Sequence, residues 1–355
     1  MKNLKTIRIN TALPGKSRSN ILIIYTGGTF GMTYDREGVL IPFDFASILD
    51  QLPALKNLAL EMTVVSFADP IDSSNIKLEH WQMIGQIIYD HYDANDGFVV
   101  LHGTDTMAFT ASALSFMLEG LTKPVVFTGA QLPISEPRSD ARENLITSLD
   151  IASARKDGKA LVPEVCIYFD YELLRGNRSK KVESMQFDAF DSGNYPPLAK
   201  AGVKIDYNFS VIRPIESSDK IGLRSKFDNN ISILKLFPGI TRTTVNAVLS
   251  SPHLKAVVLE TYGSGNAPTL EWLIEELHIA IQRNVIIVNI SQCPGGRVLQ
   301  GRYETSKRLK QIGVISGADM TTEAAVTKLM LLLGEVGLER TKEMMALSLA
   351  GELSN

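Results

Sequence analysis

The 355-residue chain has few of the residues that build disulfide scaffolds or metal centres: two cysteines, Cys166 and Cys293, and five histidines. Two cysteines cannot form a disulfide framework or a zinc site with four thiolate ligands. No histidine stands in an HExxH pattern or in a comparable ligand spacing. We therefore expect no metal site. We expect Cys293 to be a small buried residue rather than a nucleophile, because no histidine partner is evident.

The chain also lacks an excess of one charge and any long apolar run. Lys and Arg total 36 against 39 for Asp and Glu, a net charge of −3. Surfaces that bind nucleic acid are usually clearly basic, so we expect no nucleic-acid partner. The N-terminus has no apolar core of a secretory signal, and no run reaches the ~18 residues that span a bilayer. We expect a cytoplasmic protein with no membrane role.

Three common catalytic or cofactor motifs are missing as well. Gly15-Lys16-Ser17 resembles the end of a phosphate-binding P-loop, but Asn10 stands where that motif needs glycine. The sequence TGGTFG is not the dinucleotide fingerprint GxGxxG, and no GxSxG nucleophile elbow is present. These absences argue against a nucleotide-binding enzyme and against a serine hydrolase of the GxSxG type.

What the chain does contain is a regular alternation of short apolar segments with amphipathic ones. The apolar segments predict strands at 20–25, 62–66, 97–101, 124–127, 164–169, 231–236, 255–259 and 285–290. The amphipathic segments predict helices near 79–92, 106–119, 142–154, 270–282 and 322–333. Strands that are apolar throughout, alternating with helices, are typical of buried parallel sheets. The expected fold class is α/β, with mostly parallel sheets flanked by helices.

The length and one break in this alternation indicate two domains. At ~150 residues per domain, the chain is long enough for about two. Between about residues 185 and 230 the alternation gives way to Gly, Pro and Asn, which indicates a linker with a strand or two inside it. The predicted layout is an N-terminal tail at 1–19, an N-terminal α/β catalytic domain at 20–200, a linker at 201–230 and a smaller C-terminal α/β domain at 231–355.

Four of the expected strands end in small, hydroxyl-rich loops. These loops are TGGT (26–29), HGTDT (102–106), TGAQ (128–131) and ETYGSGN (260–266). In open α/β sheets, ligands bind beyond the carboxyl ends of the strands. Glycine allows close backbone approach there, and exposed N–H groups can stabilise an oxyanion. The four loops therefore predict a functional site at these strand ends.

The pair Thr104-Asp105 has two interpretations. A threonine hydroxyl becomes a useful nucleophile or proton relay when a base acts on it, and an adjacent carboxylate with an incoming lysine fits that need. Thr or Asp just before a helix also caps free N–H groups, which is the favoured interpretation of the pair taken alone. The presence of TGGT at a separate strand end shifts the balance toward catalysis.

Seven motifs occur in an order typical of one family. They are TGGTFGM, DSS (72–74), HGTDTM, TGAQ, RGNRSKK (175–181), YGSGN and GVISGADMT (313–321). Between about Ile21 and Leu353 the chain resembles the bacterial cytoplasmic (type I) L-asparaginases of the asparaginase/glutaminase family. The resemblance implies an asparaginase-like fold with Rossmann-like layers and hydrolysis of L-asparagine to L-aspartate and ammonia. It also implies that no cofactor is used, and a homo-oligomer: an intimate dimer with active sites between subunits, often paired into tetramers.

The resemblance also assigns catalytic roles. Thr29, the second threonine of TGGT, corresponds to the nucleophile that forms an aspartyl ester, which water then hydrolyses. Thr104, Asp105 and Lys181 correspond to the group that activates nucleophile or water. Sequence alone leaves open which of the two threonines is acylated first, and Thr29 is our choice.

The same resemblance assigns substrate contacts. Ser73 resembles the site for the substrate carboxylate, and Asp105 the acceptor of its ammonium group. The backbone carbonyl of Ala130 corresponds to a contact with the scissile amide, and Asn266 to a residue presented by a neighbouring subunit. Asp72 and Ser74 flank Ser73 and either line this pocket or form a helix-capping turn.

The sequence departs from its relatives at two places. Many relatives carry a catalytic tyrosine shortly after TGGT. Here the candidates are Tyr303, which we prefer, and Tyr34; an ordinary packed or surface tyrosine is the alternative interpretation of either. At the effector site known in some type I enzymes, Cys293 matches, but Glu260 stands where an arginine would meet the effector carboxylate. A carboxylate there would repel that ligand, so allosteric activation is doubtful.

Two other functions fit parts of the pattern. The asparaginase-like subunit of an archaeal-type tRNA-dependent amidotransferase shares TGGT and HGTDT, but it would carry an additional N-terminal domain, and only about 20 residues precede the first expected strand. A non-catalytic amino-acid-binding module would use the same pocket. The intact set Thr29, Thr104, Asp105 and Lys181 argues against it, since binding alone needs no threonine nucleophile.

Overall fold

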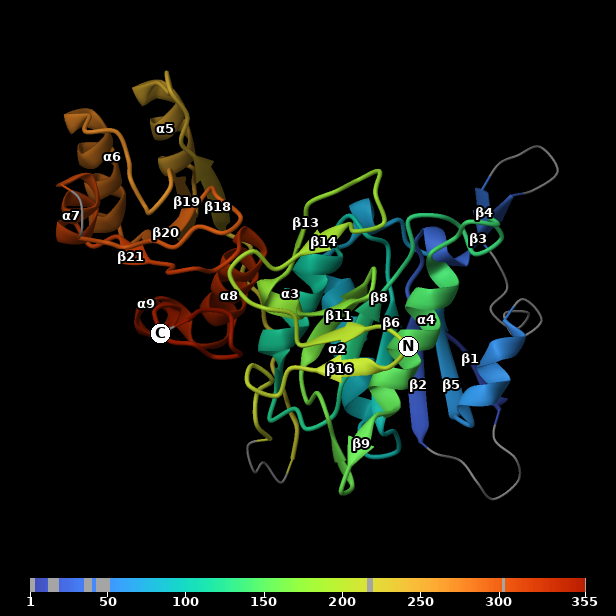
Figure 1. Cartoon of the computed structure of the whole chain (residues 1–355). Helices are drawn as coiled ribbons and strands as arrows, with labels where there is room; N and C mark the ends of the chain where they lie inside the picture. The colour runs from blue at the N-terminus through green and yellow to red at the C-terminus, as the bar shows by residue number, and fades with distance from the viewer. Residues whose placement is uncertain are drawn as a thin grey trace. The chain divides into compact units, whose positions relative to one another are not determined.

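The computed structural model describes residues 4–11, 19–34, 40–42, 52–215, 220–301 and 304–354. The chain divides into two compact units. Unit 1 comprises Met1–Asp191 and Pro196–Leu223, and unit 2 comprises Ser192–Tyr195 and Arg224–Asn355. Each unit is built around its own sheet (Figure 1).

Unit 1 contains a mixed sheet that is nine-stranded within the described residues. From edge to edge the strands are β1 (Leu4–Asn10), β5 (Glu61–Phe67), β2 (Asn20–Tyr25), β6 (Gly97–Leu101), β8 (Val125–Thr128), β11 (Val165–Phe169), β12 (Glu172–Arg175), β15 (Ala199–Ala201) and β16 (Ile205–Tyr207). The central strands β5, β2, β6, β8 and β11 are parallel. Strand β1 joins one edge antiparallel, and β12, β15 and β16 extend the other edge antiparallel.

The strand order reverses between β2 and β6. From β2 the chain passes to β5 on one side, and the next strand, β6, lies on the other side of β2. In a parallel sheet such a reversal opens a crevice beyond the carboxyl ends of the two strands, where ligands bind. The loops that leave β2 and β6 are TGGT and HGTDT.

The central strands are mainly apolar because both faces of the sheet are covered. All five residues of β6 are buried, as are five of the six in β2. Helix α4 (Ala141–Ser153) packs across β2, β6, β8 and β11. Helix α3 (Met107–Met117) packs on β11 and on α2 (Leu78–Asp90).

Unit 1 also contains short paired strands and 3₁₀ helices. The paired strands are β3 (Met32–Tyr34) with β4 (Leu40–Pro42), β7 (Leu118–Glu119) with β17 (Gly222–Leu223), β9 (Arg155–Lys156) with β10 (Lys159–Ala160), and β13 (Lys180–Lys181) with β14 (Phe190–Asp191). The 3₁₀ helices are η1 (Thr29–Gly31), η3 (Pro53–Leu58), η4 (Ser73–Asn75) and η5 (Gly176–Arg178). The β13–β14 pair carries Lys181, one of the expected site residues.

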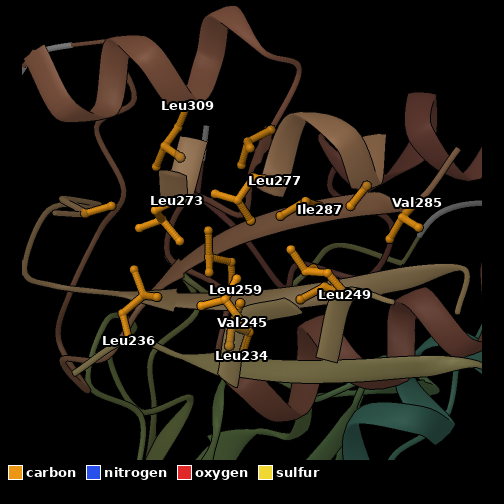
Figure 2. Close-up of a cluster of buried hydrophobic side chains, with 14 of the residues drawn as sticks. Leu234, Leu236, Val245, Leu249, Leu259, Leu273, Leu277, Val285, Ile287 and Leu309 are labelled. Atoms are coloured by element: carbon orange, nitrogen blue, oxygen red, sulfur yellow. The ribbon is translucent and has the colours of Figure 1, made fainter. Parts of the chain in front are cut away.

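Unit 2 has a parallel sheet in the order β18 (Ile231–Lys235), β19 (Ala256–Thr261), β20 (Ile286–Ser291) and β21 (Ile315–Ser316). Its helices are α5 (Arg242–Leu249), α6 (Glu271–Gln282), α7 (Glu304–Gln311), α8 (Thr322–Glu335) and α9 (Gly337–Met345). A cluster that includes Leu259, Leu273 and Leu309 fills the space between the sheet and α5, α6 and α7 (Figure 2). Helix α8 packs on β18 and β19, and α9 packs on α8 and β20.

The structure confirms the α/β class and places the expected long elements within a few residues of their predicted bounds. It differs at the N-terminus, where Leu4–Asn10, expected to be part of a tail, forms β1. Within 201–230, where a strand or two is expected, the structure has β16, β17 and the last residue of β15. Edge strands expose one side and carry polar residues, as in LKTIRIN, so their apolar signal is weak. The domain boundaries themselves stay a prediction. None of the described helices is long and apolar enough to cross a membrane.

Candidate active site

The loop after β2 is fastened to the last residue of β6. Thr26 is buried, and both its backbone N–H and its Oγ1 donate to the carbonyl oxygen of Leu101, each at 3.0 Å. The carbonyl of Thr26 in turn accepts the N–H of Ile71 at 2.8 Å. These bonds fix the start of TGGT at the point where the strand order reverses.

Glycines let three loops approach one another closely. Gly28 has φ +86°, and a Cβ there would lie 2.5 Å from the Cα of Gly103. A Cβ on Gly103 would lie 2.6 Å from the Oγ of Ser73. Carbon atoms do not approach so closely, so a side chain at either position would push the loops apart. The TGGT, HGTDT and DSS loops are therefore in direct contact.

Lys181 links the two polar residues of the HGTDT loop. Its Nζ donates to Thr104 Oγ1 at 2.8 Å and to Asp105 Oδ1 at 2.7 Å. The Lys181 side chain is 18% exposed and that of Asp105 is 58% exposed. Successive residues of a strand point to opposite faces, so the neighbouring Lys180 on β13 points away from this group.

The capping interpretation of Thr104-Asp105 is not what the structure shows. The residue that caps α3 is Thr106, and its side chain makes no capping hydrogen bond to the helix. Its Oγ1 instead donates to the carbonyl of Ser73 at 2.7 Å, which adds a second tie between the HGTDT and DSS loops. Thr104 and Asp105 are thus left to interact with Lys181.

A glutamine that the sequence analysis did not single out completes the surroundings of Thr104. The Thr104 hydroxyl donates to Gln131 Oε1 at 3.3 Å. The backbone N–H of Gln131 donates to the carboxylate of Asp140, which also accepts the N–H of Leu132 and an amide N–H of Asn144. Burial raises the pKa of Asp140, and these hydrogen bonds oppose that rise. Gln131 is the last residue of the TGAQ motif, and its neighbour Ala130 is buried.

A buried histidine, His102, holds the HGTDT loop through hydrogen bonds. His102 Nδ1 lies 2.7 Å from the carbonyl of Gly103, which can only accept, so Nδ1 carries the proton. Nε2 is then an acceptor and lies 3.0 Å from the hydroxyl of Thr110, which also accepts the indole N–H of Trp81 at 3.0 Å. Burial lowers the pKa of His102 to about 4. The imidazole is therefore neutral at physiological pH, and its two hydrogen bonds connect Gly103 to Thr110.

Thr29 differs from Thr104 in having no such partners. It is half-buried and is the first residue of η1. Within the described part of the chain, no hydrogen bond is made by its hydroxyl. The turn behind it is held by Tyr25, whose hydroxyl donates to the carbonyl of Gly31 at 3.1 Å; burial raises the pKa of Tyr25 to about 12.

The DSS segment forms η4. Asp72 caps this turn by accepting the N–H of Ser74 at 3.0 Å, so the capping interpretation holds for Asp72. Ser73 is buried, and Ser74 Oγ lies 3.4 Å from Asp105 Oδ2. Ser74 thus borders the Thr104–Asp105–Lys181 group, and Ser73 contacts the loop that carries Thr104 and Asp105.

Three further expected site residues lie in unit 2. Asn266 ends the loop after β19 and exchanges backbone hydrogen bonds with Tyr262, each at 2.9 Å. Glu260 is buried on β19, accepts the hydroxyl of Thr322 at 2.6 Å and lies 3.6 Å from Lys235 Nζ. Cys293, expected to be buried, is exposed, because it lies in the turn that follows β20.

The two candidate tyrosines cannot be placed relative to these groups. Tyr303 lies outside the described residues. Tyr34 is the last residue of β3, and its side chain lies outside the description. The choice between them stays a prediction.

Two family models match nearly the whole chain. The model described as "Asparaginase, N-terminal" matches residues 20–213, and the model "Glutaminase/Asparaginase C-terminal domain" matches residues 230–345. The chain belongs to the asparaginase family. The four functional loops lie within these two matches, three in the first and the fourth in the second.

Several known proteins are similar to this chain over most of its length. The 60 kDa lysophospholipase of Homo sapiens is 41% identical, with 94% of this chain and 61% of the relative aligned. L-asparaginase 1 of Escherichia coli is 40% identical, with 95% and 98% aligned. The crystal structure of L-asparaginase I from Vibrio cholerae superposes with a TM-score of 0.86 at 38% identity, covering 96% of this chain and all of the other. The chain thus spans about three fifths of the human relative and nearly all of the bacterial ones.

Proposed function

We propose that this protein is an L-asparagine amidohydrolase that releases L-aspartate and ammonia. The observation that carries the proposal is the contact of Lys181 Nζ with both Thr104 Oγ1 and Asp105 Oδ1, in a loop that touches TGGT. A hydroxyl, an ammonium and a carboxylate in sequence form a path for protons. This path lies beside the loop of Thr29, whose hydroxyl makes no hydrogen bond within the described residues. A two-step acyl transfer requires such a nucleophile next to a proton acceptor.

In the first step Thr29 attacks the side-chain amide carbon. Its proton moves to Thr104 Oγ1; one proton of Lys181 passes to Asp105, and the neutral amine so formed then takes the surplus proton from Thr104 Oγ1. Return of these protons delivers one to the departing nitrogen, so ammonia leaves and an aspartyl ester of Thr29 remains. In the second step water attacks the ester, with the same group accepting its proton, and Thr29 regains its hydroxyl.

The substrate is an amino acid with one carboxylate and one ammonium on the same carbon. Asp105 supports ammonium binding, because its carboxylate is 58% exposed and has an oxygen beyond the one that contacts Lys181. Ser73 and the neighbouring N–H groups would receive the carboxylate, bordered by Asp72 and Ser74. Ala130 would hold the amide through its carbonyl. One methylene separates asparagine from glutamine and is typically worth ~1–3 kcal/mol, which makes selectivity a matter of loop shape.

The finer assignments rest on the family resemblance. We propose a cytoplasmic homo-oligomer, a dimer or a dimer of dimers, in which a partner copy presents its own Asn266 to the substrate. Sedimentation equilibrium tests the oligomeric state. A monomer that retains full activity would contradict it.

The test of the proposal is ammonia release from L-asparagine and L-glutamine by the wild type, Thr29→Ala and Thr243→Ala. Thr243 is an exposed threonine on α5, so its variant controls for loss of a hydroxyl away from the site. Removal of a catalytic nucleophile costs at least ~10³-fold in kcat. Asparagine turnover that collapses only in Thr29→Ala supports the proposal, and a folded wild type that releases no ammonia from either amide contradicts it.

A second substrate class belongs in the same experiment. Because the human relative is named a lysophospholipase, fatty-acid release from a lysophosphatidylcholine should be measured in parallel. A pocket built around Asp105 and Lys181 is polar, so we expect no release. Thr29-dependent cleavage of the lipid, in the absence of asparagine turnover, would replace amidohydrolysis by lipid hydrolysis.

A further inference from the structure

The side chain of Gln131 lies between Thr104 and the chain segment that follows Lys181. Its Oε1 is 3.3 Å from Thr104 Oγ1, and its Nε2 donates to the backbone carbonyl of Gln186 at 2.9 Å. The two ends of an amide are easily confused, but here the chemistry assigns them. A carbonyl oxygen can only accept, so the end that faces Gln186 is the nitrogen, and the end that faces Thr104 is the oxygen.

The amide oxygen is an acceptor with no proton of its own. An ammonium group has donors only, so Lys181 must donate to Thr104 Oγ1. The single proton of the Thr104 hydroxyl is therefore directed to Gln131 Oε1. One lone pair of Oγ1 is taken by Lys181, and the other is left as an acceptor.

We propose that Gln131 is a positioning residue that sets the direction of the Thr104 hydroxyl, so that the oxygen presents a lone pair to the attacking group. The proposal deepens the amidohydrolase proposed above and rests on it. A Thr104 hydroxyl free to rotate would spend part of its time donating into the pocket, and in that state it cannot accept a proton from Thr29 or water.

The support of Gln131 is independent of its side chain. Asp140 holds residue 131 through the backbone N–H, with Oδ2 at 2.9 Å and Oδ1 at 3.1 Å. Asn144 joins the same carboxylate and also donates to the carbonyl of Gly129 at 3.1 Å. A substitution at position 131 leaves all these bonds in place, so the loop should keep its course and the test should concern Thr104.

The experiment compares the wild type with Gln131→Met, Gln131→Glu and Gln186→Ala. Methionine has similar length but no acceptor for Thr104, glutamate keeps an acceptor, and Gln186 contributes only its backbone carbonyl, so its alanine variant is the matched control. Asparagine turnover gives kcat and KM, and calorimetric titration gives the affinity for L-aspartate. An orienting contact made before proton transfer should affect kcat more than KM.

For Gln131→Met we expect kcat to fall about tenfold or more, with KM for asparagine changed less than about threefold. We also expect L-aspartate to bind about threefold more tightly, since a free Thr104 hydroxyl can donate to the new carboxylate. Gln131→Glu should keep kcat at least about fivefold above the methionine variant, without the tighter binding of aspartate. Gln186→Ala should match the wild type.

The opposite movement of turnover and product affinity distinguishes positioning from simple damage, which weakens both. Equal losses in Gln131→Met and Gln131→Glu, or weaker aspartate binding in Gln131→Met, would overturn the proposal. Unchanged kcat in Gln131→Met would do the same. A wild type that neither turns over asparagine nor binds aspartate would show that the proposed function had failed, and the role of Gln131 in it would fall with it.

Discussion

The two threonine loops of unit 1 are built in opposite ways. Thr104 is held by Lys181 at 2.8 Å and by Gln131 at 3.3 Å, whereas the hydroxyl of Thr29 has no hydrogen-bond partner in the described part of the chain. In the TGGT loop the fixed groups are instead Thr26 and the glycine that contacts Gly103. A proton relay must be oriented before reaction, and a nucleophile must be free to form a new bond. The contrast supports different roles for residues of the same type.

The largest effect should come from releasing Thr104. In Lys181→Met the side chain keeps its approximate length but loses the charge that bridges Thr104 and Asp105. Loss of a general acid–base partner costs ~10²–10⁴-fold, so we expect kcat for asparagine to fall by that factor. Lys180→Met, the next residue on β13, is the matched control and should stay within about twofold of the wild type. A Lys181→Met enzyme within tenfold of wild-type kcat would remove Lys181 from the relay.

The next effect comes from separating the two loops. Gly28→Ala would bring a Cβ to 2.5 Å from Gly103 Cα and would also strain a backbone at φ +86°. Gly158 has φ +77° with nothing within 4 Å of a Cβ, so Gly158→Ala reports the strain alone. Strain of this kind costs ~1–2 kcal/mol. In urea unfolding, we expect Gly28→Ala to lose more than Gly158→Ala, together with most of its turnover. Similar losses in both variants, with activity kept, would mean that the loops do not need to touch.

Much of the fold, and part of the site, follows from local patterns. Strands β2 and β6 are unbroken apolar runs because both of their faces are covered, and such runs are visible in sequence. Strand β1 is harder to predict from sequence, because apolar and polar residues are mixed in an edge strand. The loops at the strand ends mark the site because parallel strands bring their carboxyl ends to one edge.

The contacts that assemble the site could not be predicted from local sequence patterns. Lys181 reaches Thr104 from 77 positions away on a two-residue strand that no periodicity indicates, and only the family resemblance assigned it a role. Gln131 was missed because one of its partners is the backbone carbonyl of Gln186, which carries no side-chain signal. Long-range contacts of this type depend on the course of loops, which local pattern does not encode.

A third prediction concerns His102, the buried histidine of the HGTDT loop. Burial lowers the pKa of His102 from 6.5 to about 4. Above pH ~6.5 both folded and unfolded chains hold a neutral imidazole; as pH falls, the unfolded chain takes up the proton first, so the free energy of unfolding falls until pH reaches about 4. At 1.36 kcal/mol per pKa unit the loss is about 3 kcal/mol.

Urea unfolding from pH 7 to pH 4 checks this, with His102→Gln beside the wild type. Carboxylates titrate in both proteins, so the difference in unfolding free energy between them isolates the histidine, and it should shrink as pH falls. His278→Gln, at an exposed position on α6, is the control for loss of an imidazole away from the site. A difference for His102→Gln that does not change with pH would show that burial does not hinder protonation of this imidazole.

The smallest effect should come from the anchor of the Thr29 loop. Thr26→Val removes the bond from Oγ1 to the Leu101 carbonyl, but that carbonyl keeps the backbone N–H of Thr26, so the cost should be only ~0.5–1.5 kcal/mol. Thr327→Val removes a similar buried bond, to the carbonyl of Glu323 on α8, and should cost about the same. If Thr29 must be free but its loop must be fixed, kcat should fall about threefold in Thr26→Val alone. Equal kcat in the two variants would mean that the backbone bond by itself holds the loop.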